Sequence, residues 1–126
     1  MGFDWTKYLE LAECITKNSN KFPDKEACYR ASVSRAYYAA YRTTCVYLSK
    51  TDKGKFRSDG SHQDVQKYLM KSGNKLRRTI SNQLKNLHFD RKKADYQDEI
   101  RDRSPSYLAG KSIRTAKKII SELEEL

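Results

Sequence analysis

Two short basic runs in the second half of the sequence carry the residue types that bind phosphate groups. They consist of Lys75, Arg77, Arg78, Arg91, Lys92 and Lys93. Residues 50–93 hold thirteen Lys or Arg and four Asp or Glu, so this third of the chain carries nearly all of the net charge of +10. A basic stripe attracts nucleic-acid backbones because binding releases counterions, whatever the bound sequence. The two runs therefore predict an RNA-contact surface, and a merely solubilising surface is the alternative.

His88 and Phe89 lie just before the second basic run. Their rings could stack on an unpaired base, which is how proteins often recognise single-stranded RNA. The other interpretation for Phe89, and the one we favour, is a position in the hydrophobic core.

The three cysteines, Cys14, Cys28 and Cys45, form no C-x-x-C pair and are far in sequence from both histidines. We expect all three to be buried small side chains in a reducing, cytoplasmic compartment. The sequence therefore predicts no metal site and no cofactor.

The elements that must position these residues are all helical. Apolar residues at helical spacing predict helices over about 4–17, with Asp4 as N-cap, and over about 23–50, opened by Pro23. Further helices are expected from Ser61, from Asn74 with a continuation or kink beyond residue 87, and from Pro105 after the cap Ser104. No strand pattern appears, and no apolar run reaches the roughly 18–20 residues that span a bilayer. The prediction is one all-α domain over 1–126, an antiparallel bundle of four or five helices.

The second predicted helix places tyrosines and alanines on most of its sides. Tyr37 and Tyr41 share one face, Tyr38 points in another direction, and Ala39 leaves room for close approach. A helix that is apolar nearly all round is buried on nearly all sides, and tyrosine is common at interfaces. We therefore expect a homodimer through Tyr37, Tyr38, Ala39 and Tyr41, with burial inside one chain as the alternative.

The segment ASVSRAYYAAYRTTCVYL resembles the signature helix of the HEPN superfamily, in its branch of small stand-alone bacterial and archaeal proteins. The segments DWTKYLELAECI, GSHQDVQKYL and RKKADY are similar to further segments of that family, so the resemblance covers essentially the whole chain. It implies an antiparallel helical bundle that dimerises around an RNA-facing cleft. It also implies a place in a toxin–antitoxin or phage-defence module, with a partner such as a nucleotidyltransferase.

Active members of this family cleave RNA without metal, using an arginine followed after four to six residues by a histidine. Such a pair supplies a proton acceptor and a cation for the developing phosphate charge. The resemblance places Ala94 where that histidine would stand, so the usual motif is missing although Arg91 and Tyr96 remain. One literal match, Arg57 to His62, lies at a different position.

Three hypotheses follow. The leading one is an RNA-associated HEPN-like protein without ribonuclease activity through the usual motif. The second is a metal-independent endoribonuclease with a displaced site that uses Arg57 and His62, or Arg91 and Tyr96. The third is an accessory or antitoxin-like subunit that binds another protein. For Asp95 we expect a structural ion pair with an arginine such as Arg35.

Overall fold

The computed structural model describes residues 2–57 and 62–126, and within these ranges the chain is helical with no strand. The elements are α1 (Lys7–Lys17), the 3₁₀ turn η1 (Ser19–Lys21), α2 (Lys25–Thr51), α3 (His62–Met70), α4 (Lys75–Tyr96) and α5 (Pro105–Glu125). The predicted all-α bundle is confirmed.

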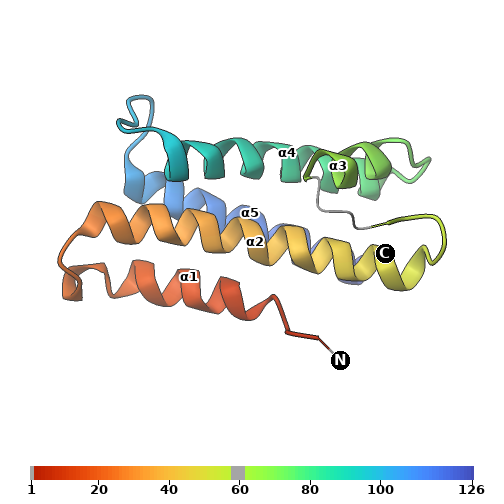
Figure 1. Cartoon of the computed structure of the whole chain (residues 1–126), viewed down its shortest axis with the longest axis horizontal. Coiled ribbons are helices and arrows are strands. Elements are labelled where there is room, and N and C mark those ends of the chain that lie inside the picture. The colour runs from red at the N-terminus through yellow and green to blue at the C-terminus, as the bar shows by residue number, and fades with distance from the viewer. Residues whose placement is uncertain (1, 58–61) are drawn as a thin grey trace.

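Helix α2 runs through the middle of the bundle (Figure 1). Helices α1 and α4 lie on opposite sides of it, α5 packs behind it, and the short α3 lies against α4. Each long helix runs opposite to the long helix before it in the chain (Figure 1). This arrangement packs the middle of α2 against α4, and the candidate functional residues of the two helices lie at this contact.

Local capping sets where three of the helices begin. Asp24, Asn74 and Ser104 each accept a hydrogen bond from the backbone N–H three residues later, at 3.0, 3.0 and 3.2 Å. Such bonds satisfy donors that the first helical turn leaves free. Asn74 and Ser104 act as expected, whereas α2 begins at Lys25, because Asp24 is its cap and Pro23 precedes the helix.

The predicted role of Asp4 as the cap of the first helix is wrong in detail. Its carboxylate accepts hydrogen bonds from the backbone N–H and the hydroxyl of Thr6, at 3.0 and 2.6 Å. The helix itself begins at Lys7, with Thr6 as the N-cap residue. Asp4 therefore stabilises the turn before α1.

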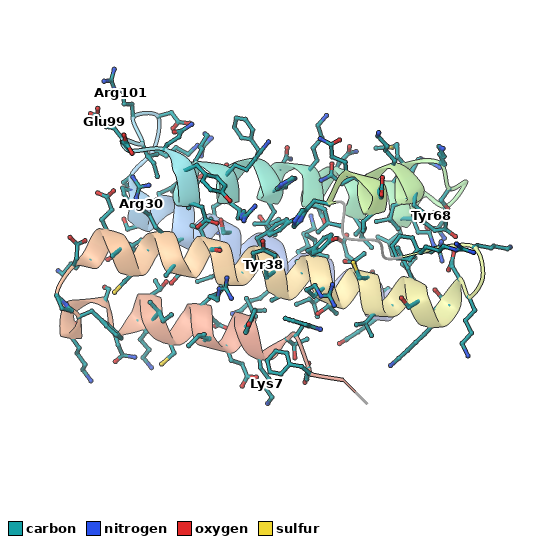
Figure 2. All side chains as sticks on the ribbon, viewed as in Figure 1. Lys7, Arg30, Tyr38, Tyr68, Glu99 and Arg101 are labelled. Atoms are coloured by element: carbon teal, nitrogen blue, oxygen red, sulfur yellow. The ribbon has the colours of Figure 1, made fainter. Side chains whose placement is uncertain are left out.

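Helix α4 continues to Tyr96 without a break, and a cation from α2 satisfies its end. The Arg30 guanidinium donates to the carbonyl oxygens of Ala94, Gln97 and Asp98, at 3.1, 2.6 and 3.3 Å. A positive charge beside the last carbonyls of a helix is favourable to its dipole. Figure 2 shows Arg30 on α2 beside the C-terminal end of α4. The three hydrogen bonds therefore connect α2 to the end of α4.

The core is filled mainly from α2 and α5. Ala36, Ala39 and Ala40 of α2 are fully buried, so helices approach closely there. In α5 the spacing of apolar residues predicts a core-facing stripe, made of Ala109, Ile113, Ala116, Ile120 and Leu123. The stripe is present with one difference: Ile119 is fully buried, whereas Ile120 is only partly buried. None of the helices within 2–57 and 62–126 is both long and apolar enough to cross a membrane.

Two residues expected in the core are exposed. Phe89 is 58% exposed and Cys14 is also exposed, whereas Cys28 and Cys45 are buried as predicted. Each of the two lies two positions after a buried residue, Leu87 or Ala12. Two residues span about 200° around a helix, so their side chains point away from the core.

Candidate nucleic-acid interface

Four rings meet where α2, α3 and α4 come together; we call Tyr37, Tyr41, His62 and His88 the His–Tyr cluster. The hydroxyl of Tyr37 is hydrogen-bonded to Nδ1 of His62. The ring centroid of His62 lies 4.5 Å from that of Tyr41 and 4.9 Å from that of His88. His88 in turn stacks on Tyr37 at 5.2 Å. As the first residue of α3, His62 connects that helix to the centre of the bundle.

The cluster holds its groups uncharged at neutral pH. Burial lowers the pKa of His62, and the nearby Arg91 guanidinium lowers it further. Burial also lowers the pKa of His88 to about 4, and its electrostatic interactions with His62, Lys92 and Arg91 lower it further. The pKa of the Tyr37 hydroxyl is raised, mainly by burial. Neutral imidazoles can accept protons, but neither histidine carries an extra proton to donate at pH 7.

A cleft of about 580 Å³ opens beside this cluster, between the start of the chain, α2 and α4. We call it the arginine cleft; its lining is Trp5, Tyr8, Ser34, Arg35, Tyr38, Arg42, Arg91 and Asp95. Three guanidinium groups and one carboxylate line it, so the cleft is positively charged. It therefore favours an anionic ligand.

The arginines of the cleft lie against aromatic rings. The Arg35 guanidinium carbon is 4.7 Å from the ring centroid of Tyr8, and that of Arg42 is 4.8 Å from Trp5. Arg91 lies 5.2 Å from the ring centroid of Tyr38. A guanidinium held by a ring keeps its N–H groups for another acceptor, because an aromatic face supplies no lone pair. The buried Nε of Arg42 has no hydrogen-bond partner among the described residues.

Asp95 is in an ion pair with an arginine as expected, but the partner is Arg91 of the same helix and not Arg35 of α2. The Arg91 Nε donates to the Asp95 carboxylate at 2.8 Å, and the Ser34 hydroxyl donates to the same oxygen at 3.3 Å. Arg35 reaches this network only through Ser34, at 3.4 Å. The two residues Arg91 and Asp95 are four apart, so a single turn of α4 makes the pair.

Tyr38 separates the arginine cleft from the His–Tyr cluster and contacts both. Its ring lies 5.2 Å from Tyr37 and 6.0 Å from His62, on the other side from the cleft. Figure 2 shows Tyr38 at the middle of α2, on the side that faces α4. Arg91 bridges the regions as well, because it lies 5.9 Å from the Tyr37 ring. The two regions therefore adjoin each other through Tyr38 and Arg91.

The structure brings some of the proposed catalytic residues together. It brings His62 and Arg91 into one region, but Arg57 is exposed and contacts no other described residue through a hydrogen bond, ion pair or ring. The whole segment between Arg57 and His62, residues 58–61 with the predicted helix start Ser61, lies outside the described residues. Tyr96 is 71% exposed, and its ring lies 5.5 Å from Arg91.

Half of the predicted RNA-contact residues are in ion pairs with carboxylates. Arg77 binds Asp52, Arg91 binds Asp95, and Lys93 binds Asp102. Of the other three, Arg78 donates to the backbone carbonyl of Ser72 at 2.9 Å, whereas Lys75 and Lys92 are exposed. Six residues that are equally basic in the sequence therefore differ in what they can offer to a ligand.

The residues expected at a dimer interface are mostly buried within a single chain. Tyr37, Ala39 and Tyr41 are 1%, 0% and 4% exposed, because α4, α5 and the His–Tyr cluster already cover them. Only Tyr38 keeps partial exposure. Tyr37, Ala39 and Tyr41 are therefore not accessible to a second chain in this fold, whereas an interface through Tyr38 and the homodimer itself stay predictions.

Three functional candidates escaped the sequence analysis: Arg42, Trp5 and His88 as a partner of His62. For His88 the sequence held one signal: it lies three residues before Arg91, so the two share a face of α4.

Within 2–57 and 62–126, no three His, Cys, Asp or Glu side chains are grouped so that they could hold a metal ion. No protein-family model, curated protein or solved structure matches the chain.

Proposed function

We propose that this chain is a HEPN-like protein that binds single-stranded RNA at the arginine cleft. The observation that supports this proposal most strongly is the set of three arginines, Arg35, Arg42 and Arg91, held against aromatic rings beside a single carboxylate. Guanidinium groups bind phosphate through two N–H groups at once, and aromatic side chains stack on unpaired bases.

The resemblance of the sequence to the HEPN superfamily supports the wider setting. In it, the protein serves a toxin–antitoxin or phage-defence module and works beside a partner such as a nucleotidyltransferase. RNA bound at the arginine cleft would be the shared target of the module. The alternative of an accessory subunit differs in one respect, because its basic face would bind an acidic protein whatever RNA is present.

The test is RNA binding by fluorescence anisotropy, with a labelled single strand of roughly 12 nucleotides. We expect Arg42→Ala to weaken binding about tenfold, the value of one lost charge-assisted contact. The slope of log affinity against log salt should flatten by about 0.7, the amount for one phosphate of a single strand. Arg101→Ala is the matched control, since Arg101 is exposed and Glu99 is its one ion-pair partner among the described residues (Figure 2).

Equal affinities and salt slopes for the wild type, Arg42→Ala and Arg101→Ala would contradict the arginine cleft as the RNA site. Binding that resists salt would favour the accessory-subunit alternative, because phosphate contacts are salt-dependent.

We also propose a homodimer, through surfaces other than the buried faces of Tyr37, Ala39 and Tyr41. Phe3, Leu11 and Val46 are apolar side chains that α1 and α2 leave exposed, at 52%, 43% and 37%. Light scattering at micromolar concentration should give twice the chain mass of 14.7 kDa. A monomer throughout a dilution series would contradict the dimer.

RNA cleavage is the second candidate, favoured by the juxtaposition of His62, His88 and Arg91. A neutral His88 could accept the proton of a ribose 2′-hydroxyl, and Arg91 could stabilise the charge that develops on the phosphate. The departing 5′-oxygen must then be protonated. Both imidazoles are neutral at pH 7, and burial raises the pKa of Tyr37, so this step has no ready donor. This asymmetry favours binding over cleavage.

The cleavage candidate is tested by incubating labelled RNA with the protein and a chelator for hours. We expect intact RNA. Fragments with 2′,3′-cyclic phosphate ends that disappear in His88→Ala would establish cleavage at the His–Tyr cluster. Loss of the fragments in Arg57→Ala alone would place the site elsewhere.

A further inference from the structure

A second hollow, of about 270 Å³, lies between α3 and α4 next to the His–Tyr cluster. Gln63 and Gln66 of α3 line it together with Asn86, His88 and Phe89 of α4. It is slightly smaller than the roughly 300–1,000 Å³ of sites that enclose drug-sized ligands. Its size suits one flat ring system better than a whole nucleotide.

Phe89 gives this hollow an aromatic surface that is open to solvent. Its side chain is 58% exposed although it lies in the middle of α4. The Lys93 ammonium is 4.7 Å from the ring centroid, and Asp102 holds that ammonium at 2.6 Å. One face of the ring is therefore covered by a fixed cation, and the other remains for a ligand. An exposed ring of this kind is a stacking platform for a base.

The polar lining consists of side-chain amides, which are both donors and acceptors. No hydrogen bond to another described residue occupies the amide of Gln63 or of Asn86. Gln66 makes one long contact, 3.5 Å from its Nε2 to Nδ1 of His88. Nucleobase edges present the same alternation of donors and acceptors, so amides can pair with them in the plane of the ring.

The charged residues around the hollow can hold the backbone on either side of a base. Lys85 and Lys92 line its rim, and neither is in an ion pair within the described part of the chain. His88 belongs both to this hollow and to the His–Tyr cluster, which adjoins the arginine cleft through Arg91. The hollow and the arginine cleft are therefore connected through the His–Tyr cluster and Arg91.

We propose that the hollow between α3 and α4 binds one unpaired nucleobase of a single-stranded RNA, stacked on Phe89 and read at its edge by Gln63 and Asn86. The proposal rests on the proposed function, because the arginine cleft would hold the backbone of the same strand. It adds a source of base preference that phosphate contacts alone do not give.

The experiment compares the wild type with Phe89→Ala, Phe89→Trp and the control Tyr107→Ala in the anisotropy assay. Tyr107 is a matched control because it is 47% exposed and also has a cation over its ring, Arg103 at 5.0 Å. We expect Phe89→Ala to weaken binding roughly tenfold or more, as for one lost base stack, with an unchanged salt slope. Phe89→Trp should keep the affinity, and Tyr107→Ala should leave it unchanged.

A second measurement follows the base itself, with RNAs that carry 2-aminopurine at successive single positions. We expect its fluorescence to be quenched on binding at one position, and this quenching to disappear in Phe89→Ala. The Gln63→Ala and Asn86→Ala variants should reduce the difference in affinity between RNAs that vary at that position. Phe89 is exposed, so circular dichroism should show an unchanged helix content in Phe89→Ala.

The two proposals fail in different ways. If RNA binds with the expected salt slope while Phe89→Ala and Tyr107→Ala behave alike, the base site is wrong and the arginine cleft stands. If Phe89→Ala weakens binding while Arg42→Ala does not, the arginine cleft is wrong and the base site stands. A wild-type protein that binds no RNA overturns both.

Discussion

Arginines in two parts of this molecule have different partners. Near the C-terminal end of α2, Arg77 makes two 2.8 Å bonds to the carboxylate of Asp52, which also accepts from the Tyr68 hydroxyl at 2.6 Å. In the arginine cleft, Arg35 and Arg42 lie against rings and have no carboxylate partner among the described residues. The guanidinium group is therefore bound to a carboxylate in the first region and lies against an aromatic ring in the second.

This difference distinguishes arginines that stabilise the fold from arginines whose N–H groups can still bind a ligand. The side chains of Arg77 and Asp52 are only 18% and 13% exposed, and the arginine holds the pKa of Asp52 well below its usual range. That pair fixes α4 and α3 to the end of α2, and its bonds are already satisfied. An arginine against a ring still lacks acceptors for most of its five N–H donors.

The largest effect on stability is expected from replacing Arg77. Arg77→Ala leaves Asp52 partly buried without its cation, so we expect unfolding free energy to fall by about 2–3 kcal/mol. RNA affinity of the folded variant should not change. Urea denaturation and anisotropy measure the two quantities, with Arg101→Ala within about 0.5 kcal/mol of wild type as control. If Arg77→Ala lost as much RNA affinity as Arg42→Ala, the distinction between structural and ligand-binding arginines would be wrong.

The His–Tyr cluster beside the arginine cleft and the Arg77–Asp52 pair should also lose their contributions to stability in different pH ranges. The folded-state pKa of His88 is about 4, below its ordinary 6.5, so the unfolded chain binds more protons between these values. Stability is therefore lost as pH falls from about 6.5 towards 4, by about 1–2 kcal/mol because solvent screens the partly exposed ring. Asp52 has a lowered pKa, so its contribution is lost only as pH falls below 3.8.

Denaturation midpoints at a series of pH values measure this separation. In His88→Asn, the loss between pH 6.5 and 4 should shrink while the loss below pH 3.8 remains. A variant that kept the full loss between pH 6.5 and 4 would show that His88 is not its source.

Replacing Asp95, the carboxylate of the arginine cleft, should have a smaller effect, and this change should increase RNA affinity. Asp95→Asn removes the one negative charge of the arginine cleft and releases the Arg91 guanidinium. We expect RNA to bind about two- to fivefold more tightly, or roughly 0.5–1 kcal/mol. Asp52→Asn is the paired control, since it should destabilise the fold without improving affinity. Weaker binding in Asp95→Asn would mean that Arg91 must be held by Asp95 to reach its ligand.

The smallest effect is expected at Tyr96. Its side chain is 71% exposed, and its hydroxyl makes no hydrogen bond within the described residues. We expect Tyr96→Phe to change unfolding free energy by less than about 0.5 kcal/mol and to leave RNA affinity unchanged. A change above about 1 kcal/mol in urea denaturation would place the hydroxyl in a hydrogen bond that the described residues do not supply.

The local sequence predicted most of the helices and several of their ends. Asn74 and Ser104 lie where a side-chain oxygen can reach a backbone N–H three residues later, and this geometry involves only one turn. The apolar stripe of α5 was likewise readable, because its spacing repeats the turn of the helix. Each of these features depends on residues that are neighbours in the chain.

The site depended on contacts between segments that are far apart in the sequence. Which arginines are paired was decided by Asp52 meeting Arg77, 25 positions away, and by Trp5 meeting Arg42. The exposure of Phe89 and the contact of His62 with His88 likewise follow from how α3 and α4 lie against α2. Helical periodicity says which residues share a face. Only the packed bundle decides what that face meets, because burial depends on the neighbouring helix.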